Sequence, residues 1–121
     1  TGGDNTVIAG QGADEITAGG GNDTFVYSDW RQSRPSPDAR DTINGFNNGN
    51  DVIRLSGIPG ILEDTDLNNV GTTANVESSS NVGDWAFQGD ILSVQTTTQA
   101  SNFLQIELPG ATFTGNDFEI V

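Results

Sequence analysis

The hydrophobic positions at the start of the chain recur at intervals of nine residues. The apolar members of this pattern are Val7, Ile16 and Phe25. Two polar positions keep the same interval, one always glycine and one always an acid or an amide: Gly3, Gly12 and Gly21, and Asn5, Asp14 and Asp23. Residues 1–26 therefore form nearly three copies of G-G-x-G-x-D-x-U-x, where U is apolar and the last three residues predict a short strand. A flexible linker rich in Gly and Asp is the alternative, but a linker would not keep three kinds of residue in one register.

The glycine-rich half of each copy has the composition of a turn that binds a hard cation. Glycine adopts backbone angles closed to other residues, so a short turn can direct several carbonyl oxygens toward one point. Aspartate adds an anionic oxygen, and Ca²⁺ prefers about six to eight oxygen ligands. One apolar residue in nine cannot offset the ordering of the backbone, which costs about 1–2 kcal/mol per residue. We therefore expect metal binding to supply the difference and to couple folding to Ca²⁺.

Beyond residue 26 the nine-residue interval stops, and the chain shows the alternation typical of longer strands. Strands are expected at residues 24–27, 41–46, 51–55, 85–88, 91–97 and 103–108. The core side chains expected from the first three are Phe25, Ile43, Phe46, Val52, Ile53 and Leu55. Residues 59–84 are rich in Asn, Ser, Thr and Gly, which predicts loops, with a helical turn near Ile61–Leu67.

The segment after the repeats resembles a known family. Residues 23–28 read DTFVYS, a loop rich in Arg, Ser and Pro follows, and residues 41–56 read DTINGFNNGNDVIRLS. This order resembles the segment after the last repeats of RTX (repeats-in-toxin) proteins, particularly the C-terminal domain of serralysin-type metalloproteases. It is also similar to the R-modules of mannuronan C-5-epimerases.

The resemblance implies an all-β fold, in which a parallel β-roll of nonapeptide repeats continues into an antiparallel, β-sandwich-like C-terminal cap. Residues 1–27 would be the end of a roll that is truncated at its N-terminus, and residues 28–121 the cap, the two forming one folded unit. In such a roll two nonapeptides make one turn, so that each copy stacks on the next but one. Stacking would place Asn5 beside Asp23, with Asp14 on the opposite side of the roll.

The resemblance also implies that Ca²⁺ is the cofactor and indicates which residues would bind it. The repeat positions expected to contribute carbonyl or side-chain oxygens are Gly3, Asn5, Gly10, Gly12, Asp14, Gly19, Gly21 and Asp23. Asp29 and Asp41 are expected as further ligands at the end of the roll, because members of the family carry acids after the last repeat.

The end of the chain places acids beside a short apolar cluster. Residues 115–121 resemble the uncleaved export signal of type I secreted proteins, and the residues that carry this likeness are Asp117, Phe118, Glu119, Ile120 and Val121. The alternative is an ordinary terminal strand that packs Phe118 and Ile120 against the domain. Both interpretations hold if the segment is a signal while the chain is unfolded and a strand once it has been exported.

The charge and the missing residue types restrict the function further. The 121 residues carry a net charge of −13, and all four basic residues are arginine. Such a charge repels nucleic acid and anionic membranes unless cations bind first, and no run approaches the ~20 apolar residues of a membrane span. Without Cys or His the chain has no disulfides, thiolate metal sites or His-containing triads. It also lacks an HExxH motif, so we expect this chain not to be an enzyme.

Three functional hypotheses remain. The first is a secreted, extracellular calcium-binding module that folds after export by the type I secretion machinery. This module would be attached to an upstream catalytic domain, such as a metalloprotease or a polysaccharide epimerase. The second is an accessory module that binds an acidic polysaccharide such as alginate, next to an epimerase or lyase domain. Its candidate glycan edge consists of Trp30, Arg31, Arg34 and Arg40, although a solvated loop is the simpler interpretation of that cluster. The third is the terminus of an RTX adhesin.

Overall fold

The computed structural model describes residues 3–8 and 10–121 of the chain, so the first two residues of the first repeat lie outside the description. The strands are β1 (Thr6–Val7), β2 (Glu15–Thr17), β3 (Thr24–Tyr27), β4 (Asp41–Asn44), β5 (Val52–Leu55), β6 (Asn68–Asn69), β7 (Asp84–Gln88), β8 (Ile91–Val94), β9 (Leu104–Glu107) and β10 (Phe118–Ile120). The helical segments in the described part are α1 (Thr73–Glu77) and the 3₁₀ turns η1 (Trp30–Gln32), η2 (Asp64–Asp66) and η3 (Gly115–Asp117). The fold is all-β, as the sequence predicts.

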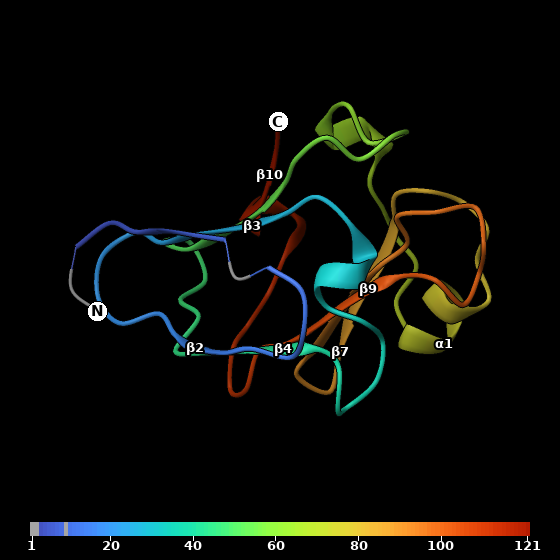
Figure 1. Cartoon of the computed structure of the whole chain (residues 1–121). Helices are drawn as coiled ribbons and strands as arrows, with labels where there is room; N and C mark the ends of the chain where they lie inside the picture. Colours follow the sequence, from blue (N-terminus) through green and yellow to red (C-terminus); the bar gives the residue numbers. More distant parts are fainter. Residues whose placement is uncertain (1–2, 9) are drawn as a thin grey trace.

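The strands form two sheets, and the repeats lie at the end of the molecule opposite α1 (Figure 1). The first sheet has the order β1-β3-β5-β10, and its neighbouring strands are parallel. The second sheet has the order β2-β4-β9-β8-β7-β6 and is mixed, because β8 runs antiparallel to both of its neighbours. The chain alternates between the two sheets from β1 to β5. The repeats and the following segment therefore extend the same pair of sheets.

Strands from alternate repeats lie side by side in the first sheet. Thr6 pairs with Thr24, and Val7 pairs with Phe25. The next strand continues the column, because Phe25 pairs with Ile53, and both of these side chains are buried. A shift of one residue would turn every apolar side chain to the other face, so the apolar pattern fixes this register.

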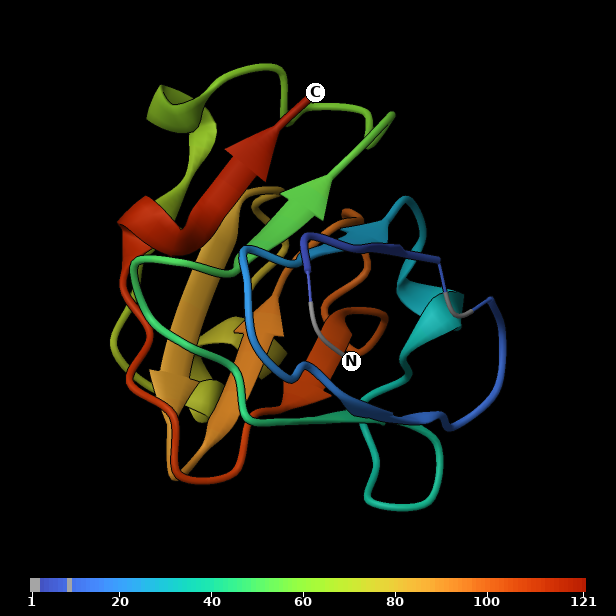
Figure 2. The same ribbon diagram turned by 90° about the vertical axis from the view of Figure 1, so that its left-hand side faces the viewer.

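The main core combines apolar side chains from both sheets. Its largest fully buried members are Phe25, Ile43, Ile53, Leu55, Ile61, Leu92, Leu104, Ile106 and Leu108. An aromatic group joins the last strand to this core, since the Phe118 ring lies 5.1 Å from Trp85 and 4.9 Å from Phe113, centroid to centroid. Figure 2 shows the result, with β10 (red) alongside β5 (green).

The second sheet contains a tight hairpin between β7 and β8. The turn residues Gly89 and Asp90 both have positive φ, 58° and 66°, which is typical of a two-residue type I′ turn. A small separate cluster packs Val76 of α1 against Ala86 and Phe103. Through this cluster the short helix packs against the sheet.

Expectations about the strands after the repeats need correction, and among them the strand expected at 91–97 ends at Val94. The strand expected at 41–46 stops at Asn44, because Gly45 adopts φ +78° and turns the chain, although Phe46 still reaches the core. Val52 is half-buried rather than a core residue. Alternation along β5 points its neighbour Ile53 inward, so Val52 faces the opposite side of the sheet.

The segment after the repeats also differs from an antiparallel, sandwich-like cap. Residues 28–121 contribute strands to both sheets, and β4 pairs in parallel with β9 while β10 pairs in parallel with β5. Within residues 59–84, the helical turn expected near Ile61–Leu67 corresponds to η2, whereas β6 and α1 were not expected. Their apolar signal is weak because each has few buried side chains.

Candidate metal centre

The turns that precede β1, β2 and β3 have a backbone geometry that favours glycine. The glycines of these turns with φ between 70° and 95° are Gly3, Gly10, Gly12, Gly19 and Gly21. Gly21 is the most constrained, because a Cβ atom there would collide with the carbonyl oxygen of Gly3. The turns of alternate repeats therefore stack in direct backbone contact, which brings peptide oxygens close together.

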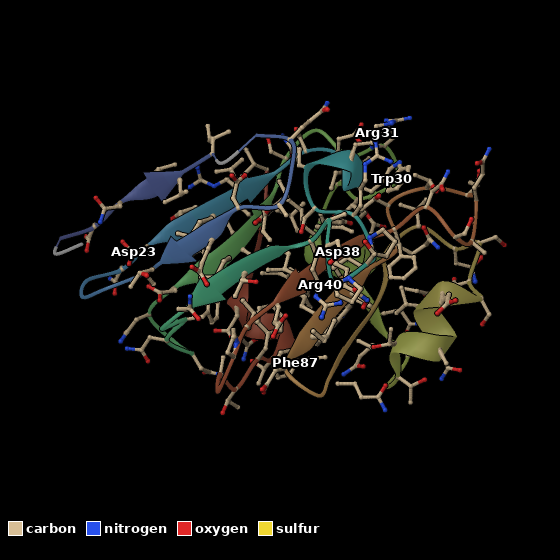
Figure 3. All side chains as sticks on the ribbon, turned by 60° about the horizontal axis from the view of Figure 1, so that its bottom comes forward. Asp23, Trp30, Arg31, Asp38, Arg40 and Phe87 are labelled. Carbon is tan, nitrogen blue, oxygen red and sulfur yellow. The ribbon has the colours of Figure 1, made fainter. Side chains whose placement is uncertain are left out.

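Asn5 and Asp23 lie together at the first sheet, as stacking of the repeats predicts. The backbone N–H of Asn5 donates to Asp23 Oδ1 at 3.0 Å, and Asn5 Nδ2 donates to the same oxygen at 3.1 Å. Asn5 Nδ2 also lies 3.1 Å from the carbonyl oxygen of Gly3. Asp23 is almost fully buried, so its carboxylate is shielded from solvent next to a glycine-rich turn. Figure 3 shows Asp23 near the end of the molecule that the repeats form.

Asp14 lies on the second sheet and finds its partner in the segment after the repeats. Its backbone N–H donates to Asp41 Oδ1 at 2.9 Å. The other oxygen of Asp41 accepts from the Tyr27 hydroxyl at 2.8 Å, and the backbone N–H of Asp41 donates to Ser33 Oγ at 2.7 Å. Burial, together with the nearby charge of Asp14, raises the pKa of Asp41, and burial also raises the pKa of Tyr27. The carboxyl group of Asp41 is thus held in a dry, hydrogen-bonded position.

Two carboxylate oxygens in this region lack a hydrogen-bond partner within the described part of the chain. They are Oδ2 of Asp14 and Oδ2 of Asp23, and both atoms are buried. A buried anionic oxygen without a donor is unfavourable unless a cation or water satisfies it. Two such oxygens next to stacked glycine turns fit a hard cation that prefers oxygen ligands, such as Ca²⁺.

The acidic side chains alone do not form a complete cation shell. Within residues 3–8 and 10–121, no group of three or more acid, His or Cys side chains is arranged to hold a metal ion. Backbone carbonyls would therefore have to supply most of the ligands. That requirement agrees with turns that consist largely of glycine.

Asp51 belongs to the same region and was not singled out from the sequence. Its Oδ1 accepts from the backbone N–H of Asp23 at 2.8 Å, and its Oδ2 accepts from the backbone N–H of Asn47 at 2.9 Å. The signal is present in the sequence, because Gly49, Asp51 and Ile53 keep the G-x-D-x-U spacing of the repeats. The interval between Asp23 and Asp51 is not a multiple of nine, which hides this extra copy from a search at that period.

Asp29 lies away from the other candidate ligands. It precedes η1, where its carboxylate accepts from the backbone N–H of Arg31 at 2.8 Å and forms an ion pair with the Arg31 guanidinium at 3.0 Å. Asp23 and Asp29 flank opposite ends of β3, and Figure 3 shows Arg31 far from Asp23. A role of Asp29 in metal binding stays a prediction.

The structure divides the candidate glycan edge. The guanidinium groups of Arg31 and Arg34 lie 5.4 and 4.9 Å from the centroid of the Trp30 ring. Arg40 points elsewhere, since it is half-buried and pairs with Glu107 at 3.2 Å and with the Gln105 side chain at 2.9 Å (Figure 3). The four residues therefore do not form one continuous basic surface.

The residues of the candidate export signal lie in and beside the terminal strand, with Asp117 at the end of η3 and Phe118–Ile120 in β10. Asp117 is buried, and its two oxygens accept from the backbone N–H groups of Gly49 and Thr114, each at 3.0 Å. Phe118 packs in the aromatic group, Glu119 pairs with Arg54, and Val121 is exposed at the end of the chain. The terminal-strand interpretation is confirmed, and the signal interpretation stays a prediction.

A comparison with protein families finds a match across nearly the whole chain. The model for the peptidase M10 serralysin C terminal matches residues 4–121. No curated protein matches the chain in sequence. In the part of the chain that the structure describes, no helix is long and apolar enough to cross a membrane.

Proposed function

This chain belongs to the family of peptidase M10 serralysin C-terminal domains, and we propose that it is a module that folds on Ca²⁺ outside the cell and carries the export signal of its parent protein. The family consists of non-catalytic C-terminal domains of secreted proteases and has RTX-type calcium-binding repeats. The resemblance of the repeats to that family is thereby confirmed. Family membership gives no support to the alternative of polysaccharide binding.

One observation supports calcium binding most strongly, namely the two buried carboxylate oxygens without partners among the described residues. When bound, Ca²⁺ would supply the positive charge that those oxygens lack. In the β-roll that we propose, Asp23 would bind one ion together with Asn5 and the carbonyl oxygens of Gly3, Gly19 and Gly21. Nδ2 of Asn5 already contacts the Gly3 carbonyl oxygen and Asp23 Oδ1, so the backbone places the group together, and the Asn5 amide would turn to present its oxygen to the ion.

A second ion would lie on the other sheet beside Asp14. Its further ligands would be the carbonyl oxygens of Gly10 and Gly12, with Asp41 adjacent. Asp41 holds the backbone N–H of Asp14 and thereby orients the turn that precedes β2. The parallel register of β2 with β4 keeps this arrangement in place, because Glu15 pairs with Thr42 directly after the two acids.

Folding should depend on the ion because the repeats bury little apolar surface. β1 has two residues and β2 has three, and Ile8, which follows β1, is 69% exposed. The chain has a net charge of −13, and its carboxylates repel one another in a compact state. Without a cation, hydrophobic burial in the repeats would not offset conformational entropy. The chain would then stay unfolded at low calcium and fold in the calcium-rich medium outside.

Export requires an unfolded chain for a further reason. Asp117 and Phe118 are buried and Phe118–Ile120 are paired in β10, so a receptor can read these residues as an extended segment only before this strand forms. We propose that the type I secretion machinery reads the signal inside the cell, and that β10 forms afterwards. An upstream protease domain would be the exported cargo.

The coupling is tested by circular dichroism during a calcium titration. In excess EGTA the chain should be largely disordered, and millimolar Ca²⁺ should produce the β signal. Mg²⁺ is the matched control and should substitute poorly, because it demands octahedral geometry at about 2.0–2.1 Å. Full β structure in EGTA would contradict calcium-dependent folding.

A further inference from the structure

We propose that Asn48–Gly49 is a site of spontaneous deamidation, and that Asp117 suppresses this modification by binding the reacting nitrogen when the C-terminal strand is in place. The chain contains two Asn-Gly pairs, Asn44–Gly45 and Asn48–Gly49. Asn-Gly is the dipeptide in which the following nitrogen is least hindered, because glycine has no Cβ atom. The inference requires the folded chain, but it does not depend on which residues bind calcium.

The reaction needs only water, the backbone nitrogen of Gly49 and the side-chain amide of Asn48. The amide nitrogen of Gly49 attacks Cγ of Asn48, the new N–Cγ bond closes a succinimide, and Nδ2 leaves as ammonia with the proton from Gly49. Water then opens the ring at either carbonyl and gives aspartate or isoaspartate at position 48. The net change is the replacement of a neutral amide by a carboxylate, with release of ammonium.

The pair lies on an accessible turn. Asn48 and Gly49 are both exposed, in a turn closed by hydrogen bonds from the backbone N–H groups of Asn50 and Asp51 to the carbonyl oxygen of Asn47, at 3.0 and 2.9 Å. Gly49 has φ +88°, and the space where a Cβ would stand is open. Solvent therefore reaches the groups that react.

Two hydrogen bonds restrain the reacting groups, and both are accepted by residues near the C-terminus. The nucleophile, Gly49 N, donates its proton to Asp117 Oδ1 at 3.0 Å. The leaving group, Asn48 Nδ2, donates to the carbonyl oxygen of Thr112 at 3.1 Å. The attack requires Gly49 N to lose its proton and to turn toward Cγ of Asn48. A nitrogen held by a carboxylate resists both changes, because charge-assisted hydrogen bonds are stronger than neutral ones.

The position of Asp117 links this chemistry to the docking of the last strand. Asp117 immediately precedes β10, and Phe118 fastens the strand in the aromatic group. Whenever the segment opens locally, Gly49 N is released and the reaction can start. A new carboxylate at position 48 would then face the negative charge of Asp117 and hinder the strand from returning. The fraction of chains modified at position 48 would therefore increase with the frequency at which the C-terminal strand is released.

The second Asn-Gly pair is an internal control. Asn44 lies in β4, is half-buried, and its carbonyl oxygen accepts from the backbone N–H of Ala18 at 2.9 Å. It pairs with Thr17 of the neighbouring strand. Local opening at Asp117 leaves this strand unchanged, whereas global unfolding would expose both pairs.

The test is peptide mapping by mass spectrometry during incubation of the calcium-loaded chain at neutral pH, comparing the intact sequence with Asp117→Ala and Asp117→Asn. We expect Asp117→Ala to raise the rate of the one-dalton mass gain at Asn48 by about fivefold, the factor that one hydrogen bond typically contributes. The rate at Asn44 should stay unchanged. Asp117→Asn retains the side-chain volume and decides the question if the alanine variant is unstable.

Two results would overturn the proposal. One is a rate at Asn48 that is unchanged or lower in both variants, which would mean that Asp117 does not restrain Gly49. The other is an equal rise at Asn44 and Asn48 in Asp117→Asn, which would mean that the effect is global unfolding.

Discussion

Asp14, which is half-buried, and Asp23 differ in one respect from the buried acids Asp41, Asp51 and Asp117. Each has one buried oxygen without a partner among the residues that the structure describes, whereas both oxygens of Asp41, Asp51 and Asp117 accept hydrogen bonds. A carboxylate with two donors is satisfied by the protein alone. The unsatisfied pair therefore marks where an external cation would contribute most, namely the acid positions of the second and third repeats.

Replacing Asp23 by Ala should lower the calcium affinity at least about tenfold, equivalent to about 1.4 kcal/mol. Replacing Asn5 by Ala should have a smaller effect, since Asn5 offers a neutral amide and Asp23 a buried charge. Isothermal titration calorimetry with Ca²⁺ provides the measurement, and Asp23→Asn is the matched control that retains the shape. An affinity of Asp23→Ala equal to that of the intact chain would refute the proposed site.

Tyr27 provides a test of the Asp41 carboxylate, whose two oxygens both accept hydrogen bonds. Tyr27→Phe removes the hydroxyl that donates to Asp41 Oδ2, and it leaves a buried carboxylate oxygen without a donor. We expect a loss of about 1.5–3 kcal/mol in the free energy of unfolding, measured by urea denaturation in excess Ca²⁺. In an Asp41→Asn background the same change should cost less, because the charged partner is gone. Equal losses in both backgrounds would show that the hydroxyl acts elsewhere.

At the scale of the element, the repeats depend on turns that touch through their backbones. Gly21→Ala should destabilise the chain more than Gly12→Ala by about 1–3 kcal/mol. Both glycines have positive φ, 87° and 95°, so the strain of the left-handed backbone is similar. They differ in space, since a Cβ at Gly21 meets the Gly3 carbonyl whereas a Cβ at Gly12 meets nothing within 4 Å. Urea unfolding in excess Ca²⁺ measures the difference, and equal losses would argue against close stacking.

Strand positions follow from the sequence where the apolar period is strong. The interval of two repeats between Val7 and Phe25 appears directly as a parallel pair, and the expected strand at 24–27 matches β3. The C-terminal limit of β4 could not be derived in the same way. The apolar residue Phe46 suggests that the strand continues, but the chain turns at Gly45 before it. Pairings between distant segments, such as β4 with β9, leave no local signal at all.

The candidate site was predictable to a similar degree. The stacking of Asn5 on Asp23 follows from the period, and the structure brings these residues together. The contact between Asp14 and Asp41 spans 27 residues of irregular sequence, so spacing alone could only suggest a partner in that region. Arg40 was grouped with Trp30 by proximity in sequence, but its contacts with Glu107 depend on a strand 67 residues away.

At the scale of the whole molecule, the first and the last strand belong to the same sheet. The first sheet runs from β1 in the first repeat to β10 at the C-terminus, and β3 and β5 lie between them. Hydrogen bonds follow the same route, from Asn5 to Asp23 and from Asp23 to Asp51. The turn before Asp51 then donates to Asp117. Order at the repeats and order at the terminal strand therefore share a continuous set of contacts.

This arrangement leads to a prediction about export. If the last five residues are the signal, a parent protein truncated after Asn116 should no longer be secreted by cells that carry a matching type I transporter. The truncation also removes Phe118 and Ile120, whose burial contributes up to about 1.5–3 kcal/mol each, so folding must be measured separately by calcium titration of the secreted or purified chain.

The decisive variant changes the acids and keeps the apolar pair. Asp117→Asn with Glu119→Gln retains Phe118 and Ile120, and so retains most of the packing of β10. If the acids are part of the signal, secreted protein should fall while intracellular protein rises, and calcium-dependent folding of the purified chain should remain. Secretion is followed by quantitative immunoblotting of medium and cells. Export of the truncated parent at the rate of the intact one would place the signal elsewhere. It would not bear on the calcium site, which the calcium titration tests separately.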